Sequence, residues 1–77
     1  MDVEKLVRMA NQIAANFEYG PDKDKAAAGV ADHLRRFWTP SMRAQIIDGY
    51  RQNTVELSDL AKLAVAKLAE QQTTTAQ

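Results

Sequence analysis

The chain has 77 residues, which allows a single domain and leaves little interior to enclose a pocket. Ten basic residues balance ten acidic ones, so no overall positive field draws the protein to nucleic acid or to an anionic membrane. There is no cysteine, which excludes disulfides, thiolate zinc sites and cysteine-ligated iron–sulfur clusters.

The first predicted helix comes from apolar residues that recur at steps of three and four. They are Val3, Leu6, Val7, Ala10, Ile13, Ala14 and Phe17. Gly20 and Pro21 then end it, because glycine can take the left-handed conformation that closes a helix and proline cannot continue one. Charged residues interrupt this first segment, so we expect no signal peptide, no membrane span and a cytoplasmic protein.

The second predicted helix is capped by Asp22 or Asp24 and repeats the same spacing. Its apolar positions are Ala27, Val30, Ala31, Leu34, Phe37 and Trp38. The early part of this helix, KAAAGVA, has so little side-chain bulk that a neighbouring helix can approach closely. We therefore expect tight helix–helix packing there.

Two further helices follow. Thr39 is a natural N-cap and Pro40 suits the first helical position, so the third helix begins there and ends near Asn53. Its inward residues are expected to be Met42, Ile46, Ile47 and Tyr50. The fourth, capped by Ser58 or Thr54, carries Leu57, Leu60, Ala61, Ala64, Val65 and Leu68 on one side.

These patterns predict an all-α fold, a small bundle of three to four helices with a frayed C-terminal tail. No segment alternates with period two, and no internal repeat is evident. The single helical domain covers residues 1–70, and the polar segment QQTTTAQ, residues 71–77, is expected to be disordered.

Catalytic residue patterns are missing from the sequence. His33 is the only histidine, so a metal site would need several carboxylates from elsewhere in the fold. Ser41 falls in a predicted first turn, where a hydroxyl usually bonds the backbone. The carboxylates are dispersed, and the three isolated glycines form no phosphate-binding loop. We expect no catalytic, cofactor-binding or metal site, and no enzyme activity of the chain by itself.

The first helix has an unusually neutral surface. From Met9 to Phe17 the sequence is MANQIAANF, nine residues without a charge, including positions that face away from the apolar side. Asn11, Gln12 and Asn16, with Met9 at the margin, form a hydrogen-bonding surface of the kind that is buried against another protein. The alternative is an amide-rich face in solvent; charge depletion favours burial.

The segment DHLRRFWTPSMR, residues 32–43, joins the second and third helices. Trp38 falls in the middle of the apolar side and is expected in the core. Phe37 lies at its edge, and two interpretations stay open: a buried ring, or an apolar ledge at the surface together with His33. Arg35 and Arg36 complement the carbonyl end of their helix. Arg43 lies near a helix start, where a cation is not favoured, so it is a candidate for a carboxylate on another chain.

Two blocks of the sequence, RMANQIAANF (Arg8 to Phe17) and ADHLRRFWTPSMR (Ala31 to Arg43), resemble the delta subunit of soluble NAD-dependent formate dehydrogenases. The similarity covers roughly the first two-thirds of the chain. The family-like residues are Arg8, Met9, Asn11, Gln12, Asn16, His33, Leu34, Arg36, Phe37, Trp38, Pro40, Met42 and Arg43. Ser41 departs from the pattern, since relatives often have a basic residue at this position.

The resemblance implies a non-catalytic accessory subunit of a cytoplasmic molybdenum- or tungsten-dependent complex that oxidises formate to carbon dioxide and reduces NAD. Its pterin cofactor, iron–sulfur clusters and flavin would lie on larger subunits, so this chain would bind no cofactor. We predict that it docks on the large catalytic subunit and stabilises the complex or assists its assembly. The expected partner-binding residues are Arg8, Met9, Asn11, Gln12, Asn16, His33, Arg36, Phe37 and Arg43.

A different reading is a small nucleic-acid-binding domain of the helix-turn-helix kind, in which Arg35, Arg36 and Arg43 meet phosphates. The zero net charge counts against it, so we expect neither a nucleic-acid partner nor a membrane partner. A purified sample can also self-associate through an uncovered docking surface.

Overall fold

The computed structural model describes the backbone of residues 2–18 and 20–75, and the side chains of this part up to Gln71. The described residues form four helices and no strand. The helices are α1 (Val3–Phe17), α2 (Lys23–Phe37), α3 (Pro40–Gln52) and α4 (Asp59–Thr75). The predicted all-α bundle is confirmed.

Each helix begins after a side-chain oxygen that accepts a hydrogen bond from an amide of the first turn. These caps are Asp2, Asp22, Thr39 and Ser58, at oxygen–nitrogen distances of 3.0, 3.2, 3.2 and 3.3 Å. The sequence left two candidate caps open for each of α2 and α4. In the structure Asp22, not Asp24, caps α2, and Ser58, not Thr54, caps α4. Thr39 and Pro40 start α3 as predicted.

The helix ends also follow the sequence signals. Gly20, with φ 86°, lies in the turn after α1 and uses the left-handed freedom of glycine. Asn53 ends α3 in the left-handed conformation, with φ 57°. Trp38 leaves α2 in extended geometry ahead of Thr39 and Pro40. The helix α4 continues to Thr75, into the segment 71–77 that was expected to fray; residues 76–77 lie outside the described part.

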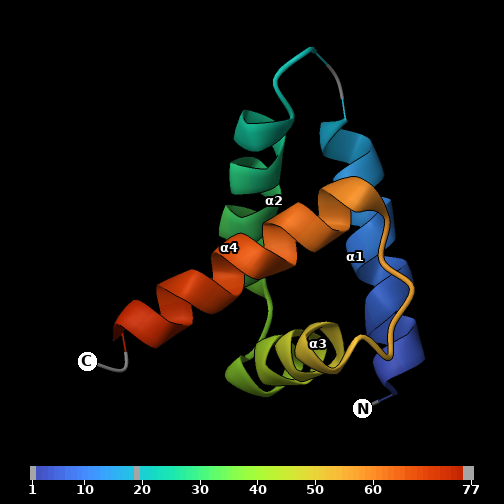
Figure 1. Ribbon diagram of the computed structural model, residues 1–77, viewed down its shortest axis with the longest axis vertical. Helices are drawn as coiled ribbons and strands as arrows, with labels where there is room; N and C mark the ends of the chain where they lie inside the picture. Colours follow the sequence, from blue (N-terminus) through green and yellow to red (C-terminus); the bar gives the residue numbers. More distant parts are fainter. Residues whose placement is uncertain (1, 19, 76–77) are drawn as a thin grey trace.

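The chain folds as an antiparallel α1–α2 hairpin, with α3 below it and α4 crossing over α2 (Figure 1). The α2–α4 contact is the most extensive between helices. Ala27 and Ala31 of α2 and Ala61 and Ala64 of α4 are all fully buried, which confirms the close packing predicted from KAAAGVA. Small side chains let the two backbones approach, so the contact excludes water.

The core lies where all four helices meet. Its largest fully buried side chains are Leu6, Leu34, Ile46, Leu60, Leu68, Val30 and Val65. Trp38 is 6% exposed, as predicted, and no polar or charged side chain among the described residues is buried. Phe37 departs from the rest of the α2 apolar set: it is 71% exposed, and Leu63 on α4 is 42% exposed. These are the large apolar side chains that the described surface leaves in solvent.

Candidate docking surface

Three aromatic side chains form a row along the seam between α1 and α2. The ring of Phe17 meets the His33 imidazole edge-on, with centroids 6.3 Å apart and planes at 67°. His33 in turn lies against Phe37, at a centroid distance of 4.7 Å and an angle of 42°. We call Phe17, His33 and Phe37 the aromatic strip. It settles the open question about Phe37 in favour of a surface ledge that includes His33.

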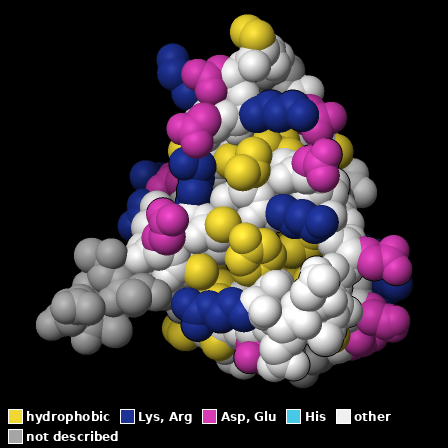
Figure 2. Space-filling view, viewed as in Figure 1, with side chains coloured by type: hydrophobic (Ala, Val, Ile, Leu, Met, Phe, Trp, Pro, Cys, Tyr) yellow, Lys and Arg dark blue, Asp and Glu magenta, His cyan; other side chains and the backbone are white. Residues whose placement is uncertain are grey.

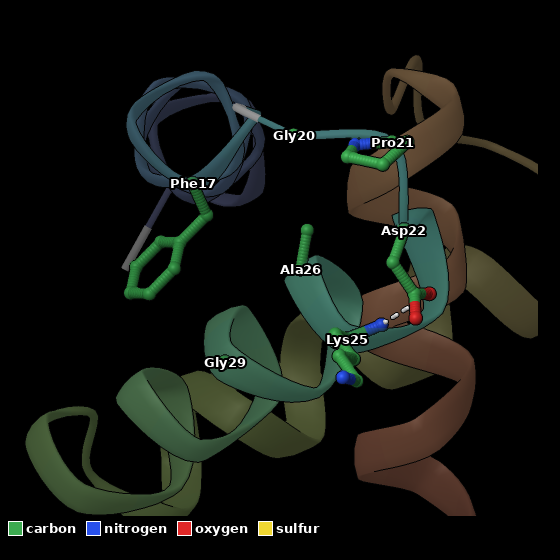
Figure 3. Close-up of a pocket in the computed structure, with 7 residues that line it drawn as sticks. All are labelled: Phe17, Gly20, Pro21, Asp22, Lys25, Ala26 and Gly29. Atoms are coloured by element: carbon green, nitrogen blue, oxygen red, sulfur yellow. Dashed lines mark hydrogen bonds between the residues drawn. The ribbon is translucent and has the colours of Figure 1, made fainter.

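The close approach of Phe17 to α2 depends on Gly29. A Cβ atom at position 29 would lie 2.9 Å from Cε1 of Phe17, closer than side chains tolerate. Figure 3 shows Phe17 projecting from α1 beside an open hollow at the α1–α2 turn. The hollow has few polar groups, and the carboxylate of Asp22 there already accepts the amide of Lys25. It therefore lacks the converging polar groups of a small-molecule site.

Charged side chains border the strip on α2. Asp32 pairs with Arg35 at 2.5 Å and with Nε of Arg36 at 3.0 Å. The hydrogen bond from Arg35, with the nearby charge of Arg36, holds the pKa of Asp32 below its ordinary value. Both arginine side chains are more than half exposed. The pairing fixes their direction while leaving them in reach of solvent or a partner.

Arg43 is used inside the chain. Its Nη1 group donates to the carbonyls of Arg35 and Trp38, at 2.5 and 3.2 Å. These are carbonyls at the end of α2, so the guanidinium caps that helix and locks it to α3. Its Nε is buried and has no hydrogen-bond partner. A cation near the start of α3 is unfavourable for that helix alone, but here it is stabilised by the carbonyl end of α2, which lies beside it.

Asn11 likewise has partners within the chain. Its amide nitrogen donates to the carbonyl of Glu56 at 3.1 Å, and its oxygen accepts from the amide of Ser58 at 2.8 Å. Both ends of the side chain thus hold the α3–α4 connection against α1. Asn11, which was expected to face a partner subunit, therefore already has hydrogen-bond partners within this chain.

The other predicted contact residues lie on or near the outer side of α1 and α2. Arg8, Gln12 and Asn16 are exposed, and Met9 is half-buried against the core. Arg8, Met9, Gln12 and Ile13 line a shallow hollow on α1. Phe17 packs partly buried against the core, in line with its place in the apolar spacing of α1, but the sequence reasoning missed its contact with His33 across α2. Glycine at position 29 was the available signal that a bulky ring crosses α2 there.

The face crossed by α4 differs from the aromatic strip, because its apolar side chains are mixed with charged ones (Figure 2). Figure 2 shows the face crossed by α4, where apolar side chains lie among lysine, arginine and acidic side chains. No group of three metal-ligating side chains occurs among the described residues. None of the described helices is long and apolar enough to cross a membrane.

Comparison with known protein families gives a match over most of the chain. The sequence model of the family described as NADH-dependant formate dehydrogenase delta subunit FdsD matches residues 5–65. The chain belongs to this family. The match covers α1 to α3 and the first part of α4, so the aromatic strip and the α2–α3 corner lie inside it. No curated protein and no solved structure matches the chain.

Membership confirms the resemblance carried by the two sequence blocks. It makes the chain a formate dehydrogenase delta subunit and implies a formate dehydrogenase complex as its setting. The described part of the delta subunit is a small helical bundle, and its exposed ring Phe37 lies within the matched region.

Proposed function

We propose that this delta subunit is a non-catalytic accessory subunit of the cytoplasmic formate dehydrogenase complex. It docks on the large catalytic subunit and stabilises the complex or assists its assembly. The observation that carries the proposal is the aromatic strip, which ends in a phenyl ring, Phe37, that is 71% exposed. Burying a side chain of this size contributes about 1.5–3 kcal/mol, and such a ring is a frequent anchor of interfaces.

The surroundings of the strip support docking. Gln12 and Asn16 on the exposed side of α1 are uncharged, and their neighbours Met9 and Ile13 are only partly buried. Interface centres are depleted of charge and keep hydrogen-bonding groups. The part of α1 from Met9 to Phe17 is free of charge and has this composition.

The environment of His33 supports a non-catalytic role. Within the described part of the chain, the imidazole packs between two phenyl rings rather than against a hydroxyl or a carboxylate. A general base needs such a partner to activate a nucleophile or to be oriented. The position of the His33 ring between Phe17 and Phe37 suits a packing role and not proton transfer.

The nucleic-acid alternative loses its main support. Arg35 and Arg36 both pair with Asp32, and Arg43 bonds to backbone carbonyls. Phosphate binding needs several cations that replace released counterions. The chain has no net positive charge, and Arg43 is turned inward onto backbone carbonyls, so few cations are left for a nucleic acid.

Co-expression tests the proposal. The tagged chain is produced with the other subunits of its complex, and the eluate is separated by size-exclusion chromatography. We expect the chain to elute with the large subunit, and omission of the chain to lower the yield or the thermal stability of the assembled enzyme. Elution of a fully stable enzyme without the chain would contradict the proposal.

A further inference from the structure

The α2–α3 corner is locally positive although the chain as a whole is neutral. Residues 32–43 contain three arginines and one aspartate, a net charge of +2 with His33 neutral. Phe37 lies within this segment and is the most exposed large apolar side chain of the described surface. An apolar ring bordered by cations matches a partner surface that is apolar at its centre and acidic at its edge.

Phe37 is held in place before any partner binds. His33 packs against one side of the ring at a centroid distance of 4.7 Å. The next residue, Trp38, is buried, and its carbonyl accepts a hydrogen bond from Arg43. The backbone on the C-terminal side of Phe37 is therefore fixed, which lowers the entropy lost on docking.

Arg36 has hydrogen-bonding capacity left for a partner. Asp32 contacts its Nε at 3.0 Å, and the guanidinium has further N–H donors on its two Nη groups. Its side chain is 66% exposed and one residue away from Phe37. Asp32 thus orients the guanidinium fork without enclosing it, as bidentate binding of a carboxylate requires.

We propose that the large subunit receives Phe37 in an apolar socket and places a carboxylate at the edge of that socket against Arg36. This inference rests on the proposed function and specifies the chemistry of the partner surface. Arg43 and His33 act as positioning residues, which set the direction of the ring.

The first test measures the affinity of the full chain for the separately purified large subunit. Phe37→Ala is expected to weaken binding by about 30-fold or more, the loss typical of a central anchor. Phe37→Leu is expected to keep part of the affinity, because it still fills an apolar socket. Leu63→Ala, the matched control at the other exposed apolar residue, is expected to leave the affinity unchanged. Circular dichroism checks that each variant retains its helices.

The second test concerns charge. Arg36→Glu is expected to weaken binding by about tenfold or more, and Arg36→Lys by less, because lysine keeps the charge and loses the fork. Lys62→Glu makes the same charge change at an exposed position on α4 and serves as the control. The wild-type affinity is expected to fall as salt rises, and that of Arg36→Glu to depend less on salt.

The outcomes distinguish a failure of the Phe37 socket or the Arg36 carboxylate from a failure of the accessory function. If the wild-type chain binds the large subunit and Phe37→Ala binds equally well, the socket is wrong and the accessory function stands. If Lys62→Glu weakens binding as much as Arg36→Glu, the localised carboxylate is wrong. If the wild-type chain binds no large subunit, the proposed function fails. Salt-dependent binding of random duplex DNA that Arg36→Glu abolishes would overturn both.

Discussion

The α2–α4 contact and the α1–α2 seam use apolar residues in opposite ways. Between α2 and α4, alanines such as Ala31 and Ala64 allow a close approach and are themselves fully buried. At the seam, Phe17 crosses α2 over Gly29, and the row continues through His33 to a ring in solvent. The first contact is complete within the chain, and the second ends in an uncovered ring. A small domain can therefore form its own core and still carry apolar surface for a larger partner.

The largest expected effect contrasts two apolar residues on the same helix. Leu34 is fully buried, so Leu34→Ala is expected to lower the free energy of unfolding by about 2–5 kcal/mol. Phe37→Ala is expected to change it by less than about 0.5 kcal/mol, because that side chain is already in solvent. Denaturant unfolding of the full chain measures both. Equal losses would show that Phe37 belongs to the core.

The next effect concerns the cap at the α2–α3 corner. Arg43→Ala removes two hydrogen bonds from a charged donor to the carbonyls at the end of α2. We expect a loss of about 1–3 kcal/mol in thermal or denaturant unfolding. Arg8→Ala, at an exposed arginine, is the control and is expected to stay within about 0.5 kcal/mol. A neutral Arg43→Ala would remove the argument that Arg43 positions Phe37.

A smaller effect is expected at the α3–α4 connection. Asn11→Ala deletes one hydrogen bond to Glu56 and one from Ser58, and a loss of about 1–2 kcal/mol is expected. Asn16→Ala removes a similar amide from an exposed position of the same helix and is expected to be neutral in stability. Amide hydrogen exchange at Ser58 is expected to rise in the first variant only. Unchanged exchange there would mean that Asn11 does not hold the connection.

The smallest effect is electrostatic. Because Arg35 and Arg36 depress the pKa of folded Asp32 below its unfolded value, the pair stabilises the fold above the unfolded pKa, and this contribution disappears as the pH falls through the folded pKa. NMR titration of the Asp32 carboxyl is expected to give a higher pKa in Arg35→Ala than in the wild type. An identical titration would show that the ion pair does not persist in solution.

The sequence predicted most of the fold because helix spacing, caps and stop signals are local. The caps Asp22 and Thr39 and the end at Asn53 were all accessible in this way. The roles of Asn11 and Arg43 were not, because their partners lie on other elements that only the folded chain brings near. The exposure of Phe37 stayed undecided for a similar reason, since helical angle alone does not show how far a neighbouring helix reaches.

The most direct test of a partner-covered α1–α2 seam is hydrogen–deuterium exchange of the full chain, with and without the large catalytic subunit. We expect added protection in α1 from residue 9 to 17 and in residues 29–43, and little change across α4. No added protection in these segments, or protection confined to α4, would contradict it.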